Sequence, residues 1–134
     1  MRIQLVLHAV AVCLYASSLL SAQDAVKVDP THYSVISEND QVRILKSHYG
    51  PHEKSVMHSH PNAVAVFLND GKVTFTLPDG KKQDESAKAG TAAFTPATVH
   101  LPENDSDTPV DVIVIELKGH AKSAMKSEMK SDSK

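Results

Sequence analysis

The histidine pair in His58-Ser59-His60 is the feature of this sequence that most clearly suggests chemistry. Side chains alternate between the two faces of a β-strand, so the two imidazoles would lie on one face and could reach the same ion. A third histidine, His100, follows 40 residues after His60, beyond two expected hairpins. A sheet that closes on itself could bring His100 back beside the pair. The three histidines therefore predict a metal site inside a small β-domain.

Such a site would use the chemistry of a divalent transition metal. Imidazole binds several of these metals, so Fe(II), Zn, Ni, Mn and Cu are all candidates on sequence grounds. Three protein ligands leave coordination positions open, which would also suit hydrolysis or hydration at zinc. A Ser-His-Asp mechanism is disfavoured, because Ser59 would point to the strand face opposite the histidines. The sequence contains no glycine-rich phosphate loop.

The bulk properties limit the partners of the protein. The net charge is −2 and no basic stripe occurs in the expected domain, so a nucleic-acid partner is not predicted. Aromatic residues make up 4% of the chain, so the core must be mainly aliphatic. A domain of under about 100 residues buries only about 60–65% of its unfolded surface. A bound metal or a second subunit would add to the stability of such a core.

Residues 1–22 have the layout of a secretory signal peptide. Arg2 is followed by an apolar run over residues 3–20, and Ser21-Ala22 supply small residues before the polar Gln23-Asp24. We expect cleavage near Ala22, a periplasmic or secreted protein, and no stable membrane insertion after cleavage. A retained membrane anchor is the alternative, because the apolar run is at the lower length limit for spanning. Cys13, the single cysteine, lies within the segment removed, so the mature chain would have no thiol.

The rest of the chain has the apolar patterns of β-strands and lacks a helical pattern of useful length. Turns are expected at Asn69-Asp70-Gly71 and Pro78-Asp79-Gly80, because Asp, Asn and Gly favour turn conformations. His100, Pro102 and Asn104 are assigned to a loop after Pro96. The expected strands cover residues 41–49, 63–68, 72–77, 81–86, 91–95 and 110–117.

Short strands at this spacing predict an all-β barrel or sandwich. We expect an N-terminal segment over 23–40, a single barrel over 41–118, and a disordered tail rich in Lys, Ser and Met over 119–134. A sandwich of the immunoglobulin type is the alternative all-β fold. It would leave the three inward histidines unexplained, and the barrel is therefore preferred.

Residues 50–104 resemble the two sequence motifs of the cupin superfamily. The first runs from Gly50 through the histidine pair to Gly71, although the gap from Gly50 to His58 is two residues longer than usual. The second consists of Gly90, Pro96, His100 and Asn104; Thr98 stands where a glycine is usual, and there is one residue fewer before the histidine. The resemblance extends over about 41–117 and implies a single-domain barrel of the double-stranded β-helix, or jelly-roll, type.

The resemblance also implies functional residues. His58, His60 and His100 match the three metal-binding histidines of the family, whereas Val64 stands where the family usually has a fourth, glutamate ligand. His52 and Glu53 are therefore candidates for an additional ligand. The expected pocket walls are apolar and consist of Val64, Val66, Phe75 and Phe94.

A three-histidine shell resembles that of non-haem iron dioxygenases within the cupins, which act on β-diketones or thiols. This favours Fe(II) as the metal and a small organic molecule as substrate. The alternative is a module without catalytic activity, a sensor or scavenger that binds a metal or small ligand. A third reading, weaker than these two, is a sugar isomerase in which the metal can be absent. Small cupins often pair through edge strands, so the resemblance also implies a homodimer.

Overall fold

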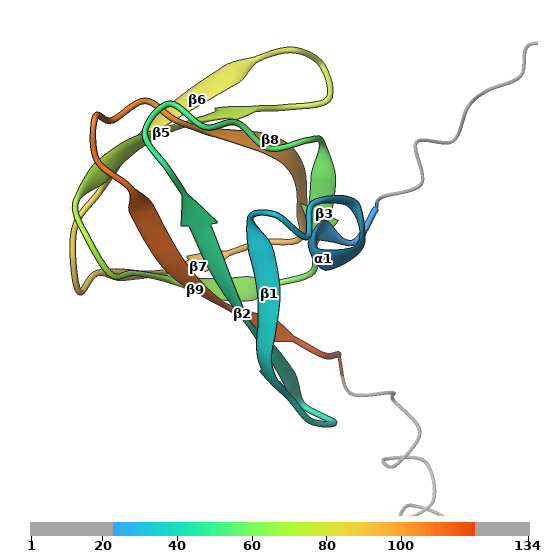
Figure 1. Ribbon diagram of the computed structural model, residues 1–134. Helices are drawn as coiled ribbons and strands as arrows, with labels where there is room; N and C mark the ends of the chain where they lie inside the picture. Colours follow the sequence, from blue (N-terminus) through green and yellow to red (C-terminus); the bar gives the residue numbers. More distant parts are fainter. Residues whose placement is uncertain (1–22, 120–134) are drawn as a thin grey trace, which may run out of the picture.

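The structure, a computed structural model, describes residues 23–119 of the chain. Two antiparallel sheets face each other and form the walls of a barrel, with a short helix beside β3 (Figure 1). The strand order is β1-β2-β9-β4-β7 in one sheet and β3-β8-β5-β6 in the other. This architecture confirms the all-β prediction. The elements are α1 (Ala25–Val28), β1 (Tyr33–Glu38), β2 (Val42–Tyr49), β3 (His58–His60), β4 (Ala63–Phe67), β5 (Gly71–Thr76), β6 (Lys82–Ala87), β7 (Ala92–Thr95), β8 (Thr98–Asn104) and β9 (Val110–Leu117).

The barrel interior follows from the alternation of side chains along the strands. On β9, Val110 and Val112 are buried, and the same parity brings Val114 to the interior. Phe67 of β4 and Val73 of β5 complete this cluster from the two sheets. A second cluster joins α1, β1 and β2 through four residues that are all at most 5% exposed: Ala25, Tyr33, Leu45 and Tyr49.

The sheet begins earlier in the chain than the sequence pattern predicts. Residues 23–40 contain α1, whose first turn is capped by the Asp24 carboxylate, and β1, which pairs with β2 along its length. The β1–β2 register shifts between Val35 and Ser37, and this irregularity interrupts the alternation that would have marked β1 as a strand. The five-stranded sheet therefore begins at Tyr33, within residues 23–40.

The loop expected around His100 is instead strand β8. It pairs with β3 on one side and with β5 on the other. Pro102 suggested a loop because proline has no N–H to donate to a ladder. Its carbonyl oxygen nevertheless accepts the backbone N–H of Ser55 at 2.9 Å, and Pro102 lies opposite Phe75 of β5. This correction matters for function, because β8 carries the third histidine.

Two expectations fall on residues that the structure does not describe: the signal peptide over 1–22, and all but the first residue of the tail over 119–134. In residues 23–119, no helix has the length and apolar character needed to cross a membrane.

Gly71, the first residue of β5, is required by packing. A Cβ atom added there would lie 2.3 Å from Cγ2 of Val110, a side chain that is 1% exposed. We expect Gly71→Ala to lower the free energy of unfolding by about 1–3 kcal/mol, the usual cost of overpacking a core. Urea denaturation would measure this loss. The loss should shrink in a Val110→Ala background, and an equal loss in both backgrounds would contradict the steric explanation.

Candidate metal centre

The three histidines come together where β3 pairs with β8. His58 lies directly opposite His100 in the register, and His60 follows on the same face of β3. The ring centroids are 4.9 Å apart for His58 and His60, 5.1 Å for His58 and His100, and 5.5 Å for His60 and His100. Each ring offers one nitrogen within 4.8 Å of the other two. Nitrogen ligands at about 2.0–2.1 Å from one ion lie at most about 4.2 Å apart, so small side-chain movements would close the trio around a metal.

Hydrogen bonds fix which nitrogen of two rings carries the proton. His58 Nδ1 donates to the carbonyl oxygen of Val56 at 2.8 Å, and His60 Nδ1 donates to Oε1 of Glu116 at 2.7 Å. Because a carbonyl and a carboxylate can only accept, Nδ1 is protonated in both neutral rings. Their Nε2 atoms therefore keep a free lone pair, which is the form that binds a metal.

The Nε2 atoms of His58 and His100 are buried and have no hydrogen-bond partner among the described residues. Buried polar atoms are normally hydrogen-bonded, because leaving one unpaired costs about 1–3 kcal/mol. Two such atoms side by side in the barrel indicate a missing binding partner. A divalent transition metal would bind both nitrogens and complete its coordination with His60, so the residues present fit such an ion.

Burial keeps His58 and His100 in the neutral form, which can bind a metal, at neutral pH. Burial and the neighbouring His60 lower the pKa of His58 to about 4, and burial together with the other two rings lowers the pKa of His100 to about 3. An imidazolium cannot bind a metal through its protonated nitrogen. Both rings are therefore neutral at pH 7, whereas a free histidine with a pKa of about 6.5 would be partly charged.

A buried carboxylate lies directly behind the trio. The side chain of Glu116, on β9, is 2% exposed; it accepts from His60 Nδ1 and, at 2.6 Å, from Arg43 Nε. Arg43 also pairs with Asp24, at the start of α1. Burial alone would raise the pKa of Glu116, but the hydrogen bonds from His60 and Arg43 lower it below its usual value. The carboxylate therefore stays ionised and orients the His60 ring, as outer-shell partners of metal ligands do.

Val64, which stands where the family resemblance implies a fourth ligand, does not face the interior. Val64 is on the outer face of β4, whereas Ala65, one residue later, lines the barrel cavity. A carboxylate at Val64 would point away from the interior, whereas Ala63 and Ala65, the inward residues on either side of it, carry no side-chain donor atom. Glu116, on the neighbouring strand β9, is opposite Ala63, and its carboxylate contacts the Nδ1 side of the His60 ring.

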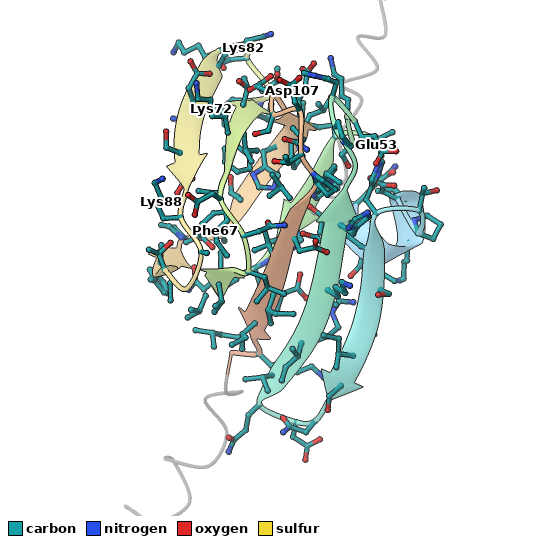
Figure 2. The ribbon with its side chains drawn as sticks, turned by 60° about the vertical axis from the view of Figure 1, so that its left-hand side comes forward. Glu53, Phe67, Lys72, Lys82, Lys88 and Asp107 are labelled. Atoms are coloured by element: carbon teal, nitrogen blue, oxygen red, sulfur yellow. The ribbon has the colours of Figure 1, made fainter. Side chains whose placement is uncertain are left out.

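The structure does not bring His52 and Glu53 to the trio. His52 has a positive φ of 58°, and its Nε2 is 2.8 Å from Oδ1 of Asp107 on the surface. Glu53 is half-exposed, accepts from the N–H of Gly50 at 2.6 Å, and lies at the surface in the β2–β3 connection (Figure 2). Neither belongs to the group of described residues that could share an ion. The tight turn at Gly50 directs both side chains away from the interior.

His32 and His48 do not belong to the trio. His48 is half-exposed and paired with Asp111. The side chain of His32 is only 11% exposed, because it bonds to Asp29 and stacks on Tyr49 at 4.5 Å. His32 therefore helps to anchor the segment before β1.

A cavity of about 260 Å³ lies inside the barrel, beside the histidines. His60, His100 and Phe75 line it, and Phe75 stacks on the His100 ring with 4.9 Å between centroids. Phe75 therefore forms part of the wall, as expected, but Val64, Val66 and Phe94 do not. The continuous apolar run over 63–68 does not reveal which parity faces inward, and the structure turns Ala65 and Phe67 to the cavity instead.

The cavity wall is mostly apolar and carries no lysine or arginine among the described residues. Lys72, Lys82 and Lys88 are on the outside of the β5–β6 hairpin, away from the interior (Figure 2). The polar groups of the wall include the buried hydroxyls of Tyr33 and Tyr49, which are 2.9 Å apart. The cavity therefore suits a small, largely apolar molecule that meets the metal at one end and lacks multiple negative charges.

Comparison with known proteins agrees with this architecture. A family model described as a cupin domain matches residues 45–116. A solved cupin domain from Bordetella pertussis Tohama I is 24% identical and superposes with a TM-score of 0.61, covering 65% of this chain and 92% of that one. An uncharacterised protein from Klebsiella pneumoniae with a double-stranded β-helix domain is 23% identical, with a TM-score of 0.54 over 66% and 77% of the two chains. No curated protein sequence matches the chain.

Proposed function

The chain belongs to the cupin superfamily, and on that premise we propose that it is an exported metal-dependent dioxygenase acting on a small organic molecule. In this proposal His58, His60 and His100 hold Fe(II), and the substrate occupies the adjoining cavity. The observation that carries the proposal is the pair of buried, unpartnered Nε2 atoms on His58 and His100. Export is proposed from the sequence of residues 1–22.

The choice of iron chemistry is supported by what surrounds the trio. Three imidazoles, with no fourth protein ligand grouped with them in the described part of the chain, leave room for both a substrate atom and dioxygen. When bound, ferrous iron supplies the one-electron chemistry that lets dioxygen react with an organic molecule. A dioxygenase places both oxygen atoms in its product, so no further reductant is required.

The residues of the chain would perform the remaining tasks. Glu116 holds the His60 ring in its ligating tautomer, and the Val56 carbonyl oxygen does the same for His58. The apolar wall around Phe75 excludes water from the substrate end of the cavity. Burial raises the pKa of Tyr49 above its ordinary value and that of Tyr33 well above it, so both hydroxyls stay protonated. Tyr49 donates its proton to the Tyr33 hydroxyl, so Tyr33 is the one that would donate to an anionic oxygen of the substrate.

A binding module without catalysis is the second candidate, because the cavity wall offers few groups for acid–base chemistry. Apart from the two ligating histidines and the two tyrosines, the ionisable residue of the wall within the described chain is Glu85, which is exposed on the edge strand β6. In that case the trio would capture a metal or a metal–ligand complex as a sensor or scavenger. A sugar-phosphate substrate fits either reading poorly, since no described cationic side chain lines the cavity.

Oxygen consumption by the iron-loaded protein tests the proposal. Protein loaded anaerobically with one Fe(II) per chain should consume dioxygen when given a suitable member of a panel of small β-diketones and thiols. The same protein loaded with Zn(II), and the iron-treated His100→Ala variant, should consume none. If stoichiometric iron is bound and no member of the panel elicits uptake, the binding module becomes the better description.

A further inference from the structure

The segment before β1 holds the strand that carries two of the three ligands. Residues 23–32, here called the N-terminal strap, comprise α1 and the chain on either side of it. α1 lies beside β3 (Figure 1). Ser59, between the two ligand histidines of β3, donates its backbone N–H at 2.8 Å and its hydroxyl at 3.1 Å to the carbonyl oxygen of Gln23. Ala25 of the strap is 0% exposed and packs into the cluster around Tyr33, so the strap is part of the packed structure.

One aspartate of the strap is linked to His60. Asp24 accepts with one carboxylate oxygen from the backbone at the start of α1, and with the other from Nη2 of Arg43 at 2.5 Å. Arg43 donates through its Nε to Glu116, and Glu116 accepts from Nδ1 of His60. A planar guanidinium bound at both nitrogens cannot rotate without breaking one of the two contacts. Asp24 therefore fixes the position of Arg43, and with it the carboxylate that orients the His60 ring.

The second aspartate of the strap is linked to His58. Asp29 is 7% exposed and accepts from the Ser55 hydroxyl and, at 2.8 Å, from Nδ1 of His32. Oγ of Ser55 lies 3.2 Å from Nδ1 of His58. A serine hydroxyl has a single proton, and here Asp29 accepts it. The Ser55 oxygen can therefore only accept from the Nδ1–H of His58, which it does alongside the carbonyl oxygen of Val56.

β3 depends on these contacts because it has few of its own. It is three residues long and lies at the edge of its sheet, where it pairs with β8. The strap supplies a carboxylate to the hydrogen-bonded network behind each of its two ligands, Asp24 for His60 and Asp29 for His58. Neither ring can turn without disturbing the strap. Because coupling between two binding events is reciprocal, docking of the strap and binding of the metal should stabilise each other.

We propose that the N-terminal strap is a positioning element of the metal centre, with Asp24 and Asp29 as its positioning residues. The inference rests on the metal site of the proposed function, but it does not depend on which reaction the metal performs. The docked strap keeps the rings of His58 and His60 in the tautomer and orientation that bind the ion. If the two aspartates served only to cap α1 and anchor the fold, their removal would lower stability and leave the metal affinity of the folded protein unchanged.

The Zn(II) affinity of the full-length chain, measured by competition with a chelator, tests the proposal. Asp24→Ala and Asp29→Ala should each bind Zn(II) about 10–100-fold more weakly than the wild type, the usual effect of losing an outer-shell partner. Asp29→Asn should recover part of the loss, because an amide oxygen can still accept the Ser55 proton. Asp107→Ala is the matched control: Asp107 is exposed and pairs with His52 on the surface, so its removal should leave the affinity unchanged.

The tautomer of His58 gives a readout that a loss of stability would not move. Nitrogen NMR of the histidine rings in the metal-free protein shows which ring nitrogen has the proton. The wild type should have the proton of His58 on Nδ1. In Asp29→Ala the Ser55 hydroxyl can turn its own proton to that nitrogen, so a share of the Nε2–H form should appear. Asp24→Ala should keep the wild-type tautomer at His58, since its link leads to His60.

Failure of this inference can be told apart from failure of the metal site. A wild type that binds no Zn(II) would refute the metal centre itself, and the role of the strap with it. A wild type that binds one Zn(II), together with folded Asp24→Ala and Asp29→Ala variants of unchanged affinity, would overturn the strap proposal and leave the site standing. Thermal melting would show that each variant is folded. If Asp29→Ala does not fold, unchanged affinity in both Asp24→Ala and Asp29→Asn would overturn the proposal equally.

Discussion

Replacing His100 with alanine is expected to abolish stoichiometric metal binding and, with it, the stabilisation that the metal provides. His100 is the ligand contributed by β8, and its Nε2 is one of the two buried nitrogens without a described partner. Loss of an outer-shell partner already costs about 10–100-fold in metal affinity, and loss of one of three ligands should cost more. Metal analysis after dialysis, and titration with Fe(II) or Zn(II), would measure the loss.

The same variant separates a metal site from a cluster that serves only packing. At a metal concentration about 100 times the Kd, a bound ion stabilises the native state by about 2.7 kcal/mol, so metal should raise the melting temperature of the wild type and not that of His100→Ala. His48→Ala is the control, because His48 is half-exposed and pairs with Asp111 away from the trio. Retention of one tightly bound metal per chain in His100→Ala would contradict the three-histidine assignment.

Removing the carboxylate of Glu116 is expected to weaken both the metal site and the fold. Glu116→Gln keeps the shape of the side chain but removes the charge that holds the proton on His60 Nδ1, so metal affinity should fall about 10–100-fold. Glu116→Ala also leaves the partly buried Arg43 without one of its two partners. Breaking a buried ion pair costs about 3–5 kcal/mol. Because Arg43 keeps its pair with Asp24, the free energy of unfolding should fall by about 3 kcal/mol, the lower end of that range.

Chelator competition would measure the affinity, and urea denaturation of the metal-free protein would measure the stability. Glu103→Gln is a matched control, because Glu103 is also a carboxylate on a strand, but it lies 3.8 Å from exposed Lys54 in a pair that should contribute under about 1 kcal/mol. Glu103→Gln should change neither quantity appreciably. Unchanged metal affinity in Glu116→Gln would show that the negative charge of Glu116 does not contribute to metal binding.

The sequence predicted the strands whose two faces differ clearly in polarity. The strand expected over 72–77 is β5, with Val73 buried and Phe75 on the cavity wall. The strand expected over 110–117 coincides with β9, although both of its faces are mostly apolar. Where both faces are apolar, as from Ala63 to Phe67, the pattern identifies a strand without showing which side faces inward. The error at Val64 and Val66 followed from that ambiguity.

The elements that were missed depend on contacts that local patterns do not record. β8 contains Pro102, which is tolerated because the pairing with β3 covers only residues 98–100, so no carbonyl oxygen of β3 requires an N–H from Pro102. Glu116 had a signal that was available in the sequence: it shares the parity of Val110, Val112 and Val114, so it is a carboxylate on the buried face of a strand. Its partner, Arg43, lies 73 residues earlier, and the closing of the sheet is what brings the two together.

The direct pairing of His58 with His100 has a consequence for when the ion is acquired. These residues lie 42 positions apart in the sequence, and strands β4 to β7 come between them. Contacts between residues so distant in sequence form late, because the loop-closure entropy must be overcome first. An ion is therefore expected to enter a finished barrel rather than to nucleate one, and metal-free chains should still reach the native topology before they are loaded.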